Sequence, residues 1–370
     1  MWMKSTDTMD YKVAWFDAKK YFELQKGAIE ERISHFNGRL YLEIGGKFMR
    51  DSHASRVLPG FDPHAKKNIF ESLRDVAEMI FCVNYEDILS NRQLSNSDIN
   101  YGEYALQMIL EVQKNIGFTP FVVINKSVRD DTEHNQKKID HFIGLMKSIG
   151  LQVFKRYKMA GYPDNTEIIL SNDGFGKDDY IPVSKNLVLV SGAASNSGKM
   201  WVCLWQMYRD FHKGFNSWYA KYETFPIWNL PVEHPINLAY EAATVDIWDY
   251  NCLDTYHLKA YNEQSVNYNR DVEAFELLKK ISDAFVASDN FVRTYQSPTD
   301  MGINRAGFAV TNDEICSIAS LREILRRKER YQEIISRGDW DKAWLDACDK
   351  IYAKALDYCK SKGYDVSQVL

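Results

Sequence analysis

Short apolar runs of strand length alternate with longer segments of helical apolar spacing through the first 200 residues. This alternation predicts βαβ units, in which right-handed crossover helices join parallel strands. The predicted strands are 39–46, 79–84, 121–125, 151–157, 167–173 and 186–192, and the main predicted helices between them are 65–77, 101–116 and 131–150. We therefore expect an α/β fold with a mostly parallel, Rossmann-like sheet.

The second half of the chain has a different character. Residues 219–270 hold three prolines and many aromatic residues, and few strand runs remain. Helices are predicted near 235–244 and 271–286, followed by a closing helical pair, 311–336 and 339–361. Gly338 separates the pair, Asp339 is the expected N-cap of its second helix and Gly363 its expected end.

A chain of 370 residues is too long for one small core. We expect an α/β anion- or nucleotide-binding domain at 1–215, a mixed, aromatic-rich substrate subdomain at 216–310, and a largely helical C-terminal region at 311–370.

The composition limits the partners and the compartment. A net charge of -5 provides no general attraction for nucleic acid. No apolar run approaches the roughly 18 residues of a membrane span, and the first residues carry no signal-peptide pattern. Six scattered cysteines without a C-x-x-C pair fit reduced thiols in a cytoplasm. Aromatic residues make up 14% and can serve a core edge, a ligand pocket or a subunit interface equally well. We expect a homo-oligomer.

The stretch "SGAASNSGKM" resembles a phosphate-binding loop between a strand and a helix. Such a loop needs small residues, a helix N-terminus and a lysine. The usual spelling is G-x-x-x-x-G-K-[ST], but here Ala193 replaces the first glycine and Met200 replaces the magnesium-binding hydroxyl. A phosphate or carboxylate site and a purely structural turn both fit. The expected ligand contacts are Gly192, Ser195, Asn196, Ser197, Gly198 and Lys199.

Two loops near the predicted strands carry further candidates. Asp173 follows the run "IIL" and resembles a strand-end acid that holds Mg²⁺, although Asn-Asp-Gly is also ordinary turn chemistry. The segment 45–63 carries His53, Arg56 and Asp62, which could bind an anion or move a proton. Its alternative interpretation is a solvated polar loop.

The second half supplies candidate pocket groups in stretches that mix charge with proline, glycine, asparagine or aromatics. Each group alone is better explained as structural, but together they indicate a shaped polar pocket. The groups are Glu223, Glu241, Arg270, Asp271 and Asp300. H-E-x-x-H, G-x-S-x-G and G-x-G-x-x-G motifs are absent, which argues against a zinc protease, a serine hydrolase and a nicotinamide enzyme.

Several long blocks of the chain agree in order with one bacterial family. They are "LYLEIGGKFMRDSHASRVLPGFDPHAK", "GAASNSGKM", "YETFPIWNLPVEHPINLAYEAATVD", "VNYNRDVEAF" and "SPTDMGINRAGF". Over roughly residues 20–310 the chain resembles the family described as domain of unknown function 1846. The resemblance implies an αβ protein with a phosphate-loop-like turn, an attached helical domain and no assigned biochemical activity.

The chain departs from this family at two places. Relatives tend toward a proline- and glycine-rich loop before the shared Ser-Gly-Lys-Met, so Met200 is a family trait. Relatives also usually continue into a further C-terminal αβ region. An ATP-dependent zinc protease has been suggested for some members, and the absent zinc motif gives that suggestion no support here.

Three functions follow as hypotheses. The first is a cytoplasmic enzyme that binds ATP with Mg²⁺ and phosphorylates or activates a small polar metabolite, as a transferase or a ligase-like enzyme. Lys199 would bridge the phosphates, Asp173 would hold the metal, and His53 and Arg56 would bind the second substrate. The second is an ATP-independent isomerase, lyase or transferase that uses the same loop to hold a substrate phosphate or carboxylate. The third is a non-catalytic binding or assembly protein.

Overall fold

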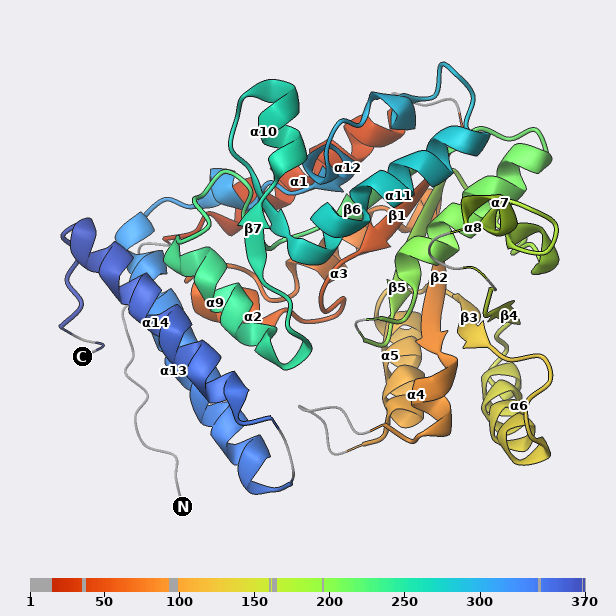
Figure 1. Cartoon of the computed structure of the whole chain (residues 1–370), viewed down its shortest axis with the longest axis horizontal. Coiled ribbons are helices and arrows are strands. Elements are labelled where there is room, and N and C mark those ends of the chain that lie inside the picture. Colours follow the sequence, from red (N-terminus) through yellow and green to blue (C-terminus); the bar gives the residue numbers. More distant parts are fainter. Residues whose placement is uncertain are drawn as a thin grey trace.

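A seven-stranded, fully parallel sheet forms the centre of the computed structural model, which describes residues 15–34, 38–92, 99–159, 161, 165–194, 196–338, 341–367 and 369 (Figure 1). The strand order is β4-β3-β2-β5-β1-β6-β9. The strands are β1 Arg39–Ile44, β2 Ala77–Asn84, β3 Phe121–Ser127, β4 Val153–Tyr157, β5 Leu187–Gly192, β6 Ser217–Tyr222 and β9 Gly302–Ile303, and β7 Asn251–Leu253 pairs antiparallel with β8 Val266–Tyr268. The predicted α/β fold class is confirmed.

Fourteen helices are found among the described residues. In the first half they are α1 Ala18–Ser34, α2 Ser52–Val57, α3 Ala65–Ser72, α4 Tyr85–Leu89, α5 Tyr101–Asn115, α6 Glu133–Ser148, α7 Thr166–Ile169 and α8 Lys199–His212. In the second half they are α9 Pro235–Ala243, α10 Thr255–Tyr261, α11 Asn269–Phe285, α12 Pro298–Met301, α13 Asp313–Ser336 and α14 Ala343–Ser361. Side-chain caps set several of their starts, such as the capping box that Asn100 and Glu103 form at α5.

Strand β6 shows why the sheet has helices on both faces. Its alternate residues point to opposite sides, as the period of a strand requires. Lys221 contacts Asp271 of α11, whereas the hydroxyl of Tyr222 lies 2.9 Å from that of Tyr21 on α1. α11 therefore covers one face together with α8, which packs on β1, β5 and β6, and α1 covers the other.

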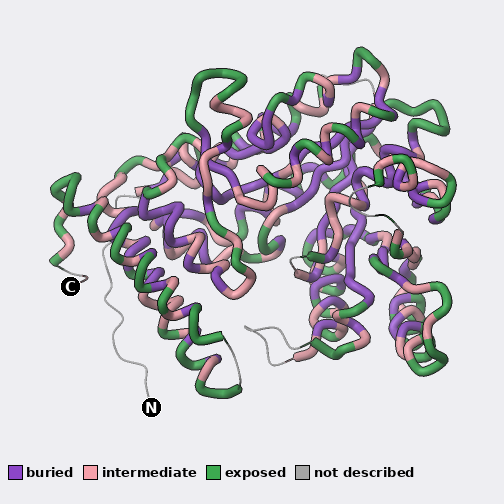
Figure 2. The backbone as a smooth tube through the Cα atoms, viewed as in Figure 1, coloured by how far each residue is buried: buried purple, intermediate pink, exposed green. Residues whose placement is uncertain are grey.

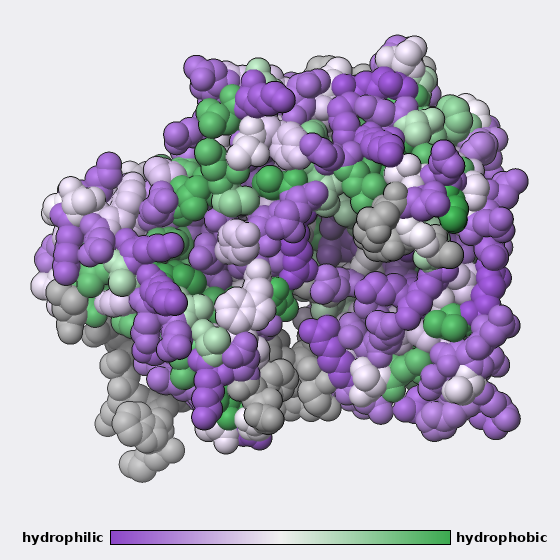
Figure 3. All heavy atoms as spheres, in the orientation of Figure 1, coloured by the Kyte–Doolittle hydropathy of each residue, from purple (hydrophilic) through white to green (hydrophobic). Residues whose placement is uncertain are grey.

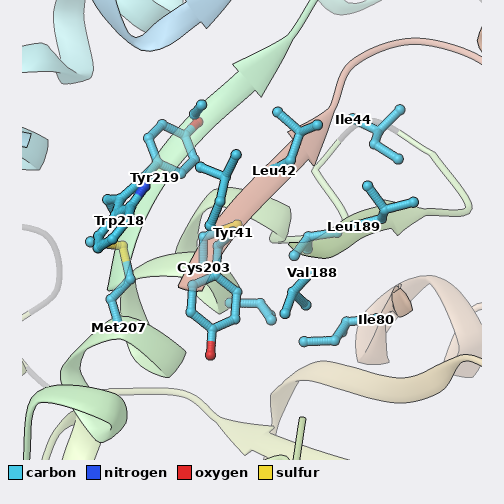
Figure 4. Packing of buried hydrophobic residues seen from close by; sticks show 14 of the residues in the cluster. Tyr41, Leu42, Ile44, Ile80, Val188, Leu189, Cys203, Met207, Trp218 and Tyr219 are labelled. Atoms are coloured by element: carbon cyan, nitrogen blue, oxygen red, sulfur yellow. The ribbon is translucent and has the colours of Figure 1, made fainter. Parts of the chain in front are cut away.

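Both covered faces are apolar and close-packed. All six residues of β1 are buried, which a strand inside a doubly covered parallel sheet requires (Figure 2). Figure 4 shows part of this core, in which Tyr41 and Leu42 of β1 lie near Cys203 of α8 and Val188 and Leu189 of β5.

A second core joins the helical C-terminal pair to the rest of the molecule. α13 packs against α14, α9 and α2, as Figure 1 also shows for the two long helices. The predicted closing helical pair is confirmed. The predicted N-cap, Asp339, lies outside the described residues. Among those residues, no helix is both long and apolar enough to cross a membrane.

Three sequence predictions differ from the structure. The run 167–173 is not a strand, because Asn165 caps the short helix α7 and a turn follows it. The helix predicted over 65–77 stops at Ser72, and Ala77 already belongs to β2. Strands β6 and β9 extend the sheet beyond residue 215, so the segment 216–310 completes the α/β sheet as well as adding helices.

Candidate functional site

A cavity of about 720 Å³ lies at the carboxyl ends of the parallel strands, where open α/β sheets bind their ligands. Residues at or just beyond the ends of six strands line it: Glu43 and Gly45 at the end of β1, Glu86 after β2, Asn125 and Lys126 at β3, Arg156 and Tyr157 at β4, Asn196 and Gly198 after β5, and Lys221 and Glu223 at β6. Helices α8, α9 and α11 provide the other walls. In the space-filling view, the surface is hollowed between the parts that carry α9 and α4, with hydrophilic side chains along the hollow (Figure 3).

One side of the cavity is rich in cations. Lys126, Arg156 and Lys158 come from the ends of β3 and β4, and Lys199 begins α8. Of the lining acids, Glu86 lies on this side, with its Oε1 2.6 Å from Lys158 Nζ, and Glu43 borders it beside Lys199. We call these four cationic residues the cationic side; it carries an excess of positive charge that would attract an anion.

The loop before α8 is held in shape by two strand-end asparagines. Asn125 donates from Nδ2 to the carbonyl oxygen of Ser197 at 2.7 Å, and Asn84 donates to that of Asn196 at 3.3 Å. Gly198 follows with φ 83°, a left-handed conformation that glycine adopts without strain. These contacts fix the point at which the chain turns into α8.

The interior of this loop is occupied by its own side chain. A Cβ atom on Gly192 would lie 2.2 Å from the Ser197 hydroxyl oxygen, so the two residues are in close contact. The Ser197 hydroxyl is fully buried and has no hydrogen-bond partner among the residues that the structure describes. An anion would therefore meet this segment at the start of α8, where the N-cap Gly198 provides no side-chain cap and Lys199 is the first residue.

The opposite side of the cavity is built from paired charges. Lys199 Nζ lies 3.9 Å from Glu43 Oε1, and Glu43 also accepts a hydrogen bond of 2.7 Å from the Tyr219 hydroxyl. Glu43 is the register partner of Lys221 on β6. Lys221 in turn contacts both Glu223 and Asp271, so charges of alternating sign run across two neighbouring strands.

Glu223 is the most strongly perturbed carboxyl that lines the cavity. Glu223 is 3% exposed, and burial raises the pKa of its carboxyl to about 7, although Lys221 acts to lower it. Burial also opposes the charge of Lys221, but Asp271 and Glu223 outweigh it and hold the pKa of Lys221 well above its ordinary range. A carboxyl that titrates near neutral pH beside a fixed cation is suited to transfer a proton.

Aromatic rings and one more ion pair close the cavity. Phe225 and Tyr240 stack with ring centroids 5.3 Å apart and planes 14° apart, and Tyr268 packs against Tyr240. We call these three rings the aromatic wall. Beside it, Arg270 forms an ion pair with Asp249.

Arg270 also contacts the loop before α8. Its guanidinium donates to the side-chain oxygen of Asn196 at 2.9 Å and to the carbonyl oxygen of Ile247 at 3.0 Å. The loop is therefore tied to α11 across the cavity.

The predicted site residues divide into two groups. Asn196, Gly198, Lys199, Glu223 and Arg270 line the cavity together. Gly192 and Ser197 lie beneath the start of α8, and Ser195 lies outside the described residues. The others, which do not line this cavity, are His53, Arg56, Asp62, Asp173, Glu241 and Asp300.

His53 and Arg56 are engaged by one buried carboxylate on α13. His53 Nδ1 lies 3.0 Å from Glu323 Oε1, and Arg56 Nε donates to Glu323 Oε2 at 2.6 Å. Arg326 and Arg327 bind the same carboxylate. Burial lowers the pKa of His53 despite this contact, and the ring packs edge-on against Phe225 and Tyr240. The cluster joins α2 to α13 behind the aromatic wall.

The remaining predicted acids have local structural partners. Asp62 accepts hydrogen bonds from the His64 amide and the Asn68 side chain, and Glu241 accepts one from the Asn251 amide. Asp300 completes a capping box with Ser297 at α12. None of these contacts uses the cavity.

Asp173 does not have the setting that a magnesium ligand needs. It is exposed in the turn after α7 and follows a helix instead of a strand. Among the described residues, no group of three or more acidic, histidine or cysteine side chains is arranged to hold a metal ion.

Sequence reasoning missed several cavity residues. Glu43, Lys126, Arg156 and Lys221 were not predicted, although each is a charged residue at the end of a β-strand. A charged residue within an otherwise apolar run, such as Glu43 in "RLYLEI", is the signal that could have identified them.

The fold and the cavity together define a parallel α/β protein with a cavity at the carboxyl edge of its sheet. The family model "Domain of unknown function DUF1846, N-terminal" matches residues 14–355, and the chain belongs to this family. It is similar to the UPF0371 protein of Corynebacterium aurimucosum, with 42% identity over 340 residues, covering 92% of this chain and 66% of the relative.

Two further relatives give the same result. UPF0371 proteins of Clostridioides difficile and Streptococcus pneumoniae are each 41% identical, over 331 and 320 residues, which is 90% and 86% of this chain. The matched parts make up 64% and 62% of those relatives. The chain thus spans less than two thirds of the length of these proteins.

Proposed function

We propose that the protein is an enzyme that binds a phosphorylated small molecule in the strand-end cavity and acts on it by proton transfer. The observation that carries this proposal is the convergence of the cationic side with the start of α8. Lys126, Arg156, Lys158 and Lys199 line one cavity, and the first amides of a 14-residue helix face no side-chain cap at Gly198. A helix N-terminus and several cations favour a phosphate for the same electrostatic reason.

Glu223 is the proposed general acid or base. Its raised pKa, caused by burial, leaves both protonation states populated near neutral pH. Lys221 and Asp271 would orient this carboxyl, because Lys221 contacts both acids. A ligand whose phosphate is held at Lys199 would be fixed in position for proton transfer by Glu223.

ATP is one of the phosphorylated small molecules, and the cavity favours ATP no more than other members of this class. Ser197 fills the interior of the loop against Gly192, where a nucleotide-binding loop would enclose a phosphate. Met200 supplies no hydroxyl for Mg²⁺. We therefore favour a ligand that brings its own phosphate, and ATP with Mg²⁺ serves as a comparison in the test.

The proposal also places the protein in the cytoplasm and makes it a homo-oligomer. All six cysteines are free thiols and five are buried, which suits a reducing cytoplasm. Phe211 in the last turn of α8 and Phe215 just after that helix are 46% and 54% exposed and are suited to a contact between copies of a homo-oligomer.

Direct binding tests the proposal. Purified protein is screened by thermal shift against inorganic phosphate, sugar phosphates, nucleotides with and without Mg²⁺, and phosphorylated amino acids, and the hits are titrated by calorimetry. We expect a phosphorylated ligand to bind, and Lys199→Ala to weaken it at least about tenfold. The matched control is Lys360→Ala on α14, which removes an exposed lysine remote from the lining residues.

Turnover then separates an enzyme from a binding protein. The bound ligand is incubated with the protein and followed by phosphorus and proton NMR. Glu223→Gln should retain binding and lose turnover by about 100-fold or more. A variant that turns over as fast as the wild type would rule out Glu223 as the acid or base.

A further inference from the structure

We infer that the phosphorylated ligand is a carbohydrate, whose ring packs on the aromatic wall and whose hydroxyl groups are bound by Asp249, Asp271 and Glu223. This inference rests on the proposed function and concerns the half of the cavity opposite the cationic side. Three observations carry it.

The first observation is a fixed aromatic surface. The Phe225 and Tyr240 rings are stacked, and the Tyr268 hydroxyl donates to the Phe225 carbonyl oxygen at 2.7 Å. His53 supports the wall from behind, with its ring 5.3 Å from Phe225 and 5.6 Å from Tyr240. The C–H face of a sugar ring offers the flat apolar surface that such rings bury without reorganisation.

The second observation is that the three carboxyl groups are already paired with cations. Asp249 pairs with Arg270, and Asp271 and Glu223 share Lys221. An ammonium group of a ligand would have to compete with Lys221 and Arg270. A neutral hydroxyl has no such competitor, and a carboxylate bound to one cation keeps lone pairs that accept hydrogen bonds.

The third observation is the polarity of the whole cavity. The four cations of the cationic side meet two lining acids, Glu86 and, at the border beside Lys199, Glu43. The opposite half holds Asp51, Glu223, Asp249 and Asp271 against Lys66, Lys221 and Arg270. One end of the ligand should therefore be anionic and the other a neutral donor of hydrogen bonds. A sugar phosphate has these two ends.

A sugar phosphate and an alkyl phosphate carry the same charge, so a comparison of their affinities separates carbohydrate recognition from simple phosphate binding. Hexose 6-phosphates and pentose 5-phosphates are compared by calorimetry with n-hexyl phosphate, which has no hydroxyl groups, and with inorganic phosphate and ATP. We expect at least one sugar phosphate to bind at least about tenfold more tightly than each of these three, because sites built for hydroxyl groups reject ligands that lack them.

Two variants locate the sugar end. Tyr240→Leu removes the central ring of the aromatic wall. Asp249→Asn removes the charge of an acid that is partly exposed. Both should weaken sugar phosphate binding at least about fivefold and leave the affinity for inorganic phosphate within about twofold. A correctly folded Asp249→Asn protein keeps the test valid if Tyr240→Leu does not fold.

The outcomes are distinct. If n-hexyl phosphate or ATP binds as tightly as every sugar phosphate, or if Asp249→Asn weakens inorganic phosphate equally, the carbohydrate inference is wrong and the proposed function stands. If no phosphorylated ligand binds to the folded wild-type protein, the proposed function itself is wrong, and the inference falls with it.

Discussion

Lys221 Nζ lies 2.7 Å from Glu223 Oε1, and the same ammonium group contacts Asp271 on α11. One partly buried cation thus serves two acids and joins the carboxyl end of β6 to the helix that covers it. Because Glu43 is the register partner of Lys221, this group continues across the sheet to Lys199 at the start of α8. The proposed acid–base group and the proposed phosphate site are therefore linked by contacts on the same face of the sheet.

The ionisation of Glu223 should make the folded protein less stable as the pH rises. Burial raises its pKa to about 7, above that of the same carboxyl in the unfolded chain. Between about pH 4.5 and 7 the folded state keeps the proton that the unfolded state has lost, so the free energy of unfolding falls across this window. Glu223→Gln should remove at most about 3 kcal/mol of this fall.

Urea denaturation at pH 5 and at pH 8 measures the effect. Wild type and Glu223→Gln are compared at both values, and Glu333→Gln, an exposed acid on α13, serves as the control. An equal pH dependence in wild type and Glu223→Gln would show that Glu223 ionises normally.

Glu323 should be important for folding and not for ligand binding. It is 2% exposed and accepts hydrogen bonds from Arg56, Arg326 and Arg327. Burial acts to raise the pKa of Glu323, but these hydrogen bonds and that of His53 outweigh it and hold the pKa well below its usual range. Glu323→Ala leaves these cations without their partner and should cost about 3–5 kcal/mol.

The comparison variant for Glu323 lies on the same helix. Glu333→Ala breaks the exposed pair with Arg330 and should cost no more than about 0.5 kcal/mol. Similar free energies of unfolding for Glu323→Ala and Glu333→Ala would contradict the structural role assigned to the cluster.

Gly192 should be intolerant of even one added methyl group. A Cβ there would lie 2.2 Å from the Ser197 hydroxyl oxygen and 2.9 Å from the Cys82 carbonyl oxygen. Gly192→Ala should therefore cost about 1–3 kcal/mol and weaken phosphate binding by shifting the loop before α8. Gly144→Ala in α6, where a Cβ meets nothing within 4 Å, should be neutral or stabilising by up to about 1 kcal/mol.

Thermal melts and phosphate titrations of these two glycine variants decide the point. If Gly192→Ala has the same melting temperature and the same phosphate affinity as the wild type, the close contact between Gly192 and Ser197 does not shape the site.

Local patterns were enough to predict most of the sheet and most of the long helices. Apolar runs flanked by turns identify β2, β3 and β5, and amphipathic spacing identifies α5 and α6. The run 167–173 was mistaken for a strand because three consecutive apolar residues cannot distinguish a short strand from a capped helical turn. β6, "SWYAKY", was missed because its polar-tipped tyrosines and Lys221 conceal a fully covered strand.

The site was predicted only in part, because charged side chains acquire their role from distant partners. Lys199, Glu223 and Arg270 were identified from local composition. His53 and Arg56 have the same composition signals, but Glu323, about 270 residues later in the chain, binds them both. Sequence separation of this size leaves no local pattern from which the contact could be predicted.

A crystal structure of the protein with the tightest-binding phosphorylated ligand tests the central claim most directly. Our account predicts the phosphate at the start of α8, within hydrogen-bond distance of Lys199 Nζ, and the rest of the ligand directed toward Glu223. A phosphate bound elsewhere, such as on Arg56 and Arg326 beside Glu323, with the strand-end cavity free of ligand, would contradict it.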